Sequence, residues 1–208
     1  MRWTLLVALF TLLSPSQAGA AVLDPPVDCA PLRDDEARQI CAAANGGDAD
    51  ALWRTAEFFI EGRRATRDDA TALRLLSAGA ADQHPRAIAL LGHMYGHGRG
   101  VARDRATYLR LTVQAAAMGD AVGQLNLGLA HERGYGVPRD QVEAVRLYRL
   151  AAAQGYRWGQ FRLGLALRWG RGAGQDLVEA ARYYRWPRSK ACPTRSSTSA
   201  TCTAPASA

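Results

Sequence analysis

The amino-acid sequence repeats with a period of 36 residues, and this regularity restricts the chain to folds that stack one kind of unit. Three residue types recur in register, without a gap, in each of four copies. They are a glycine (Gly62, Gly98, Gly134, Gly170), an aspartate (Asp68, Asp104, Asp140, Asp176) and an arginine (Arg74, Arg110, Arg146, Arg182). A register kept over four copies indicates a supersecondary unit that buries its apolar face against its neighbours.

Each copy is predicted to form two helices. In the third copy, residues 121–133 have apolar side chains at helical spacing, and a glycine- and proline-containing turn at 134–139 ends this helix. Asp140 is expected to cap a second helix that ends at Gly155, because its carboxylate can accept a bond from an unpaired amide of the first turn. Glu143 is expected to complete a capping box with Asp140, and Glu179 is expected to do the same with Asp176.

A small residue also recurs in the middle of the first helix of every copy, as Ala56, Gly92, Gly128 and Gly164. Glycine inside a helix costs about 1 kcal/mol relative to alanine. A residue with that cost at the same place in three copies predicts a close helix crossing in which no side chain fits.

These patterns resemble the Sel-one-like repeat family, a relative of the tetratricopeptide class. The family hallmark is a first helix reading A-x-x-x-L-G-x-x-Y-x-x-G, then G-V-x-x-D, then a second helix ending A-A-x-x-G. It is matched at 87–98, at 100–104 and at 116–119. The first copy departs most, because Arg63-Arg64-Ala65-Thr66 replaces the Gly-Val turn. The resemblance implies an all-α, right-handed α/α solenoid with repeats at 49–84, 85–120 and 121–156 and a partial repeat at 157–185.

The N-terminus has the three-part layout of a secretory signal peptide over residues 1–20: a basic start, an apolar stretch and a small-residue exit ending at Ala20. The apolar stretch is too short for a membrane anchor, and no span is expected after signal removal. Export to the periplasm or the medium makes Cys29 and Cys41 a predicted disulfide. It would tie the incoming strand to the first helix, which begins near Asp34. Residues 21–48 would then form an N-terminal segment whose helix caps the solenoid.

The residues after Arg185 break the repeat. They read WPRSKACPTRSSTSATCTAPASA and contain five serines, whereas residues 21–185 contain only Ser77. One interpretation is a disordered Ser/Thr-rich tail. The other is a frameshift. When the chain from Trp186 onward is back-translated with suitable synonymous codons and read from one base earlier, the translation is LAAQQGLPDAQFNLGHVH, which continues the repeat. Residues 186–208 are then a frameshift product and Cys192 and Cys202 are artefacts; otherwise Cys192–Cys202 is the second local pairing.

No motif of an enzyme active site is present, so we expect no catalysis and no cofactor. The chain lacks G-x-x-x-x-G-K-[ST], H-E-x-x-H and S-x-x-K motifs. His93 and His97, at i and i+4, have metal-clasping spacing but no recurring third ligand, so we read them as surface residues and expect no metal. The net charge of +7 falls to +3 when Arg2 and the charged residues of 186–208 are excluded, and nucleic acid is not an expected partner.

The residues that vary between copies are the candidates for partner binding, because the invariant ones hold the solenoid together. On the first helices, which line the concave face in tetratricopeptide-like folds, they include Arg86, His93, His97, Asn126, Arg133, Trp158, Arg162 and Trp169. Exposed tryptophan and arginine side chains frequently anchor interfaces. An alternative for Trp158 and Trp169 is that they pack between copies.

The predicted function is an exported protein–protein interaction scaffold that holds a segment of a partner, such as a cell-envelope protein or peptide, in its concave groove. The resemblance supports this function, since bacterial members of the family are mostly adaptors. A second function is peptidoglycan or β-lactam binding or hydrolysis, which is linked to secreted cysteine-rich members. Those members carry a cysteine pair in each helix pair, and the repeats here carry none before residue 186. A third possibility is that this chain is a truncated product without a function.

The frameshift hypothesis predicts a specific result from DNA. An independent read of the coding sequence across codons 183 to 190 is expected to differ by a single-base insertion or deletion, restoring a repeat that ends in a glycine at position 191. An intact frame in that read would refute the hypothesis and leave the Ser/Thr-rich tail as the interpretation.

Overall fold

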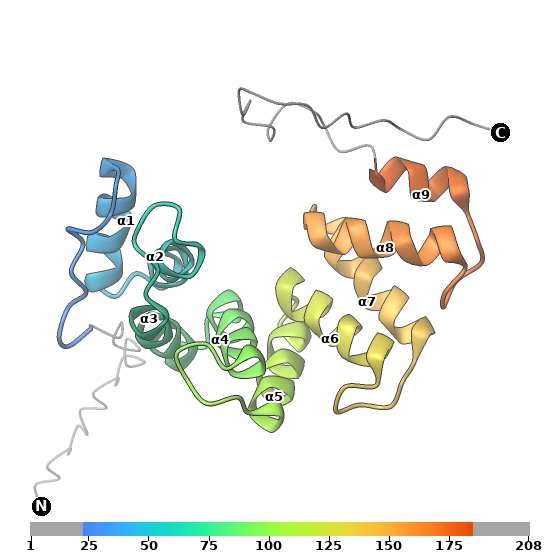
Figure 1. Cartoon of the computed structure of the whole chain (residues 1–208), viewed down its shortest axis with the longest axis horizontal. Helices are drawn as coiled ribbons and strands as arrows, with labels where there is room; N and C mark the ends of the chain where they lie inside the picture. Colours follow the sequence, from blue (N-terminus) through green and yellow to red (C-terminus); the bar gives the residue numbers. More distant parts are fainter. Residues whose placement is uncertain (1–22, 185–208) are drawn as a thin grey trace, which may run out of the picture.

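The computed structural model describes residues 23–184, and within them the chain consists of helices joined by turns. The predicted signal peptide and the predicted frameshift product lie outside these residues. Figure 1 shows the helices following an arc from α1 at one end to α9 at the other. No helix within 23–184 has the length and apolarity needed to cross a bilayer.

The helices recur at intervals of 36 residues. The first helices of the repeats are α2 (Ala49–Glu61), α4 (Pro85–His97), α6 (Ala121–Arg133) and α8 (Arg157–Trp169). The second helices are α3 (Asp69–Ala81), α5 (Arg105–Ala117), α7 (Gln141–Ala153) and α9 (Leu177–Tyr184). They are preceded by α1 (Asp35–Asn45), which ends 36 residues before α3 and so occupies the place of a second helix. The prediction of an all-α solenoid of helix pairs is confirmed.

The repeated aspartate fixes the start of each second helix. In α7, the carboxylate of Asp140 accepts bonds from the amides of Val142 and Glu143, as the capping argument predicts. The other half of the predicted capping box, a bond from the Asp140 backbone N–H to the Glu143 carboxylate, is wrong. The backbone N–H of Asp140 donates to the carbonyl of His131 in α6 at 2.9 Å, and Arg146 holds the Glu143 carboxylate in a bidentate pair.

The same backbone bond joins the two helices in every repeat. It runs from the aspartate N–H to a first-helix carbonyl nine residues earlier: Asp68 to Phe59, Asp104 to Tyr95, Asp140 to His131 and Asp176 to Leu167. The amide that a capping glutamate would need is already occupied, so the aspartate closes the turn instead. The turn also needs the repeated glycine, which ends each first helix with φ between 61° and 70°.

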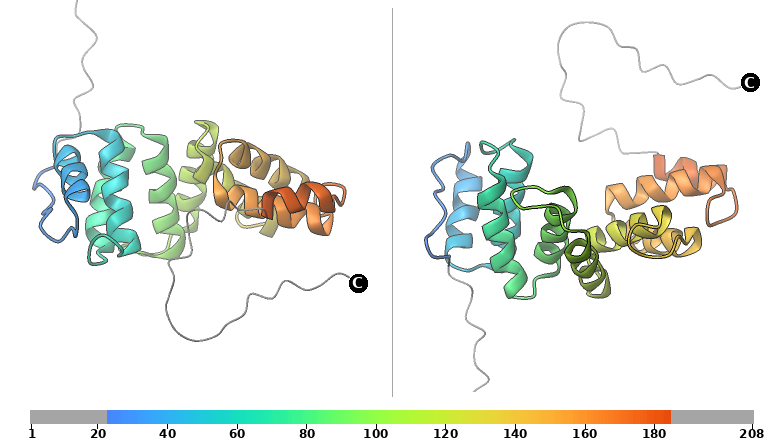
Figure 2. Two further views of the ribbon diagram at one scale, coloured as in Figure 1. Left: turned by 90° about the horizontal axis from the view of Figure 1, so that it is seen from above. Right: turned by 60° about the horizontal axis from the view of Figure 1, so that its bottom comes forward.

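The solenoid curves because its first helices lie closer together than its second helices. Each helix packs on its sequence neighbours, and in addition α2 contacts α4, α4 contacts α6, and α6 contacts α8. The described second helices make no comparable contact with one another. The first helices therefore line the inner, concave face. Figure 2 shows that the row is also twisted, since the axes of α8 and α9 are turned relative to those of α2 and α3.

The mid-helix glycines lie at close crossings, which confirms the prediction for Gly92 and Gly128. A Cβ atom at Gly92 would lie 3.2 Å from the Cβ of Leu111, and one at Gly128 would lie 2.6 Å from the ring of Tyr148. Gly164 is buried in α8. The expected cost of glycine in a helix is therefore offset by the close packing of the two helices of one repeat.

The N-terminal segment covers the open end of the first repeat. Cys29 and Cys41 form the predicted disulfide, and the side chains of Leu32 and Cys41 are fully buried. The divergent turn of the first repeat is part of this attachment. Arg64 forms ion pairs with Glu36 and Asp34, and its carbonyl accepts a bond from the backbone of Arg33.

The apolar core is divided at the junction between α5 and α6. One cluster of buried side chains extends from the N-terminal segment through α5 and includes Val122, and a second occupies α6 to α9. Three of the buried polar side chains, Asp120, Gln124 and Asn126, lie at this junction. The Asp120 carboxylate caps α6 and pairs with Arg86 at 2.7 Å, so the junction is joined by polar contacts as well as by packing.

The close contacts between repeats predict which glycines can be exchanged. A Cβ at Gly123 would lie 2.7 Å from the Ala115 Cβ and 2.7–2.8 Å from backbone atoms of residues 115 and 116. Gly123→Ala is expected to lower the free energy of unfolding by about 1–3 kcal/mol, measured by urea denaturation. The second substitution Ala115→Gly is not expected to restore stability, because the backbone contacts remain.

Two controls accompany this measurement. A Cβ at Gly79 would approach only the Cβ of Ala87 closely, at 2.8 Å, so Gly79→Ala is expected to be rescued by Ala87→Gly. Gly174 faces open space, and Gly174→Ala is expected to leave stability unchanged within about 0.5 kcal/mol. Rescue of Gly123→Ala by Ala115→Gly would show that the backbones are not in close contact there.

Candidate functional site

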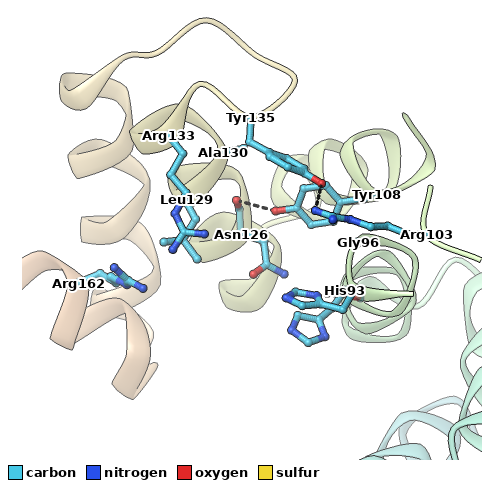
Figure 3. A pocket seen from close by; sticks show the side chains of 11 residues that line it. His93, Gly96, Arg103, Tyr108, Asn126, Leu129, Ala130, Arg133, Tyr135 and Arg162 are labelled. Carbon is cyan, nitrogen blue, oxygen red and sulfur yellow. Dashed lines mark hydrogen bonds between the residues drawn. The ribbon is translucent and has the colours of Figure 1, made fainter. Parts of the chain in front are cut away.

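A cavity of about 450 Å³ opens on the concave face beside α4, α6 and α8; we call it the central cavity. Its size is within the range of small-ligand sites. It is lined by His93, Gly96, His97, Arg103, Tyr108, Asn126, Leu129, Ala130, Arg133, Tyr135 and Arg162. Figure 3 shows His93 of α4 on one side of the cavity and Arg133 and Arg162 of α6 and α8 on the other, with Asn126 between them. None of these described lining residues carries a carboxylate.

Two tyrosines form one wall of the central cavity. The rings of Tyr108 and Tyr135 meet edge to face with centroids 5.6 Å apart, and the Tyr108 hydroxyl donates to the backbone carbonyl of Asn126 at 3.2 Å. Arg105 lies over the Tyr135 ring at 4.2 Å, and Arg103 donates to the Tyr135 hydroxyl at 2.9 Å. Hydrogen bonding from Arg105, and then from Arg103, lowers the pKa of Tyr135. Burial raises the pKa of Tyr108.

A second wall is a pair of stacked histidines on α4. The rings of His93 and His97 lie 4.1 Å apart, and the Nδ1 atom of His97 is 2.9 Å from the His93 carbonyl oxygen. Burial, together with the charges of His97 and Arg99, lowers the pKa of His93 to about 4. His93 is therefore neutral at pH 7, and the arginines supply the positive charge of the site. Within residues 23–184, no group of three potential ligands surrounds a point where a metal ion could bind.

Five of the eight residues singled out from the sequence line this cavity: His93, His97, Asn126, Arg133 and Arg162. Arg86 does not. It pairs with Asp120 of the next repeat at 2.7 Å and lies over the rings of Trp53 and Tyr156. It thus joins α2, α4 and the starts of α6 and α8.

The two tryptophans also lie outside the central cavity. Trp158 is 48% exposed and meets Phe161 edge to face, and Trp169 is 58% exposed. Trp169 lines a smaller cavity of about 80 Å³ between α7 and α8, beside Tyr148 and Arg171. Both tryptophans remain candidates for partner contact, because about half of each side chain is accessible.

Sequence reasoning missed Arg103, Tyr108 and Tyr135, which come from turns and from a second helix. The repeat register did contain a signal for Tyr108, because the other three copies have an alanine there (Ala72, Ala144, Ala180). The tyrosine fits because the chain has Gly96 opposite it. A Cβ at Gly96 would lie 2.7 Å from the Tyr108 ring. Gly96 and Tyr108 together make the second repeat different from its neighbours.

Comparison with known sequences identifies the unit. The family model of the Sel1 repeat matches residues 49–84, 85–120, 121–156 and 159–185. The chain belongs to the Sel1 repeat family. The predicted resemblance is therefore confirmed, and Sel1 repeat proteins generally mediate protein–protein interactions and are typically non-catalytic scaffolds. None of the curated proteins matches the chain.

Solved structures show the same fold. A protective antigen present in uropathogenic Escherichia coli strains, which displays an SLR fold, is 32% identical with a TM-score of 0.57 over 73% of this chain and 32% of its own. A Sel1 repeat protein from Oxalobacter formigenes is 28% identical with a TM-score of 0.57 over 66% of this chain and 56% of its own. The chain thus spans about a third and about half of the lengths of these two proteins.

The half-buried position of His93 predicts a pH dependence of stability. In the unfolded chain this imidazole takes up a proton near pH 6.5, but in the folded protein only near pH 4, so stability is lost as the pH falls between these values. Replacing it with the leucine of the next two repeats, His93→Leu, is expected to remove this loss. At pH 4 the wild type should have lost about 2–3 kcal/mol more than the variant, relative to pH 7.

Urea denaturation of both proteins from pH 7 to pH 4 measures this difference. His131→Leu serves as a control, because His131 lies in α6 outside the central cavity. Parallel pH profiles for the wild type and His93→Leu would contradict the prediction.

Proposed function

We propose that this Sel1 repeat protein is an exported scaffold that binds a segment of a partner protein or peptide along its concave face. The observation that carries the proposal is the convergence of the variable positions. The recurring aspartate caps the second helices, the recurring glycine ends the first helices, and the small mid-helix residues lie at close crossings. In contrast, His93, Asn126 and Arg162 differ between copies and line one cavity. A surface whose side chains vary on a constant frame is suited to recognising a particular ligand.

The export part of the proposal rests on the N-terminus. The layout of residues 1–20 is that of a secretory signal. The Cys29–Cys41 disulfide supports it, because such bonds persist in oxidising compartments such as the periplasm or the extracellular medium. A component of the cell envelope is the partner class that these two features favour.

The alternative of peptidoglycan or β-lactam chemistry gains no specific support from the described site. Opening a β-lactam ring requires an activated nucleophile. Among residues 23–184, the side chains that line the central cavity include no serine, threonine or cysteine that could be this nucleophile.

A peptide selection tests the function without assuming a partner. A random peptide library displayed on phage is panned against the immobilised full-length chain, and the selected peptides are measured by fluorescence anisotropy. We expect binders whose affinity falls by about tenfold or more when the cavity is altered by His97→Ala or Arg162→Ala. The exposed Arg110 on the second helix α5 gives the matched control, Arg110→Ala, which should leave the affinity unchanged.

Two outcomes would contradict the proposal. One is a failure to enrich any peptide, or enrichment of peptides whose affinity is the same for the cavity variants and the wild type. The other is turnover of nitrocefin by the purified chain, which would favour the enzymatic alternative.

A further inference from the structure

Positive charge and an unsatisfied hydrogen-bond donor converge in the central cavity. Arg103, Arg133 and Arg162 reach it from a turn and from two different helices. Arg133 is exposed and forms no ion pair with any described residue. Arg162 is 4.0 Å from the nearest oxygen of Glu132, a carboxylate that already accepts the Tyr148 hydroxyl at 2.6 Å. Arginine charge is therefore only weakly neutralised by the protein itself.

Asn126 is the second, independent observation. Its side chain lines the cavity and is only 7% exposed, and its Nδ2 atom has no hydrogen-bond acceptor. In Figure 3 its amide lies on the side of the cavity nearest His93. A buried donor without an acceptor is costly and uncommon. An oxygen atom of a bound ligand would supply that acceptor.

On the basis of the proposed function, we infer that the central cavity is a carboxylate-binding site that anchors an aspartate or glutamate of an acidic peptide segment. Guanidinium groups match the two oxygens of a carboxylate, and the Asn126 amide adds a neutral donor. The wall of Tyr108 and Tyr135 offers flat apolar surface for the neighbouring part of the peptide.

The charge at the other end of the concave face favours a peptide over a long polyanion. A second cavity of about 490 Å³ between α1 and α2 is lined by Glu36, Asp48 and Asp50, and Arg54 is the one basic side chain among its described lining residues. A nucleic acid lying along the face would meet these carboxylates and be repelled. A peptide that has acidic residues at the central cavity and neutral or basic residues towards α1 avoids this repulsion.

The test compares two fluorescein-labelled peptides by anisotropy with the full-length chain at low ionic strength. Both contain glycine, alanine and one tyrosine; the first carries three glutamates and the second carries glutamines in their place. We expect the glutamate peptide to bind at least about tenfold more tightly. Arg133→Gln and Arg162→Gln should each weaken its binding about five- to tenfold, and the control Arg110→Gln should not change it.

Asn126→Leu separates a binding role from a structural role. Leucine has a similar volume and removes the unpaired donor, so the melting temperature should stay the same or rise. Binding of the glutamate peptide should nevertheless weaken. Equal loss of stability and binding would overturn the role given to this residue.

The outcomes distinguish this inference from the proposed function. If the glutamate and glutamine peptides bind equally, or if a single-stranded DNA oligonucleotide rather than the glutamate peptide shows the Arg133 and Arg162 dependence, the carboxylate site is overturned. If that happens while phage-selected peptides still lose affinity in the cavity variants, the scaffold function stands and only its ligand class is wrong. If both experiments fail, the concave face is not a peptide-binding surface.

Discussion

The close approach of neighbouring helices is the constraint on which the rest of the structure depends. Where α5 meets α6, the small residues Ala115 and Gly123 bring the backbones so near that an added methyl group would strike backbone atoms. Within a repeat, Gly128 lets Tyr148 of the partner helix lie against α6. Because these contacts are repeated at a fixed interval, each unit is set at a similar angle to the next. The contacts among first helices then produce the curvature that gives the molecule its concave face.

The candidate site lies where this regularity is interrupted. The apolar core divides between α5 and α6, and the buried polar side chains of Asp120 and Asn126 lie at that division. A tyrosine at 108 replaces the alanine of the other copies, and Gly96 provides the space for its ring. An idealised repeat would fill this place with apolar side chains. Here the packing leaves a cavity with polar walls, held on rigid helices, which is the arrangement that a selective binding surface needs.

Charge is distributed unevenly along the concave face. Carboxylates of α1 and α2 line its N-terminal part, and arginines line its centre. The Arg86–Asp120 ion pair lies between these two regions. Its charges neutralise each other inside the protein, so the pair stabilises the junction and offers little charge to a ligand. The side-chain exposure of Asp120 is 6%, and removal of one partner would leave a buried charge unpaired. The same residue types thus serve packing at one position and an open surface at another.

The sequence by itself determined the fold and the places where its helices begin and end. The 36-residue period fixed the helix pairs, and the aspartate and glycine positions fixed their starts and ends, because capping and turn formation depend on a few adjacent residues. It also identified the Cys29–Cys41 bond and five residues of the cavity. Only the tertiary structure decided which variable residues face one another. Arg86 pairs with Asp120, which is 34 residues away in the sequence. The backbone N–H of Asp140 donates to the His131 carbonyl and so cannot complete a capping box. Tyr108 reaches the cavity from a second helix. Sequence spacing defines the face of a helix on which a residue lies. The partners of that residue depend on the side chains of the neighbouring repeat, and packing sets the distance and angle between the two repeats.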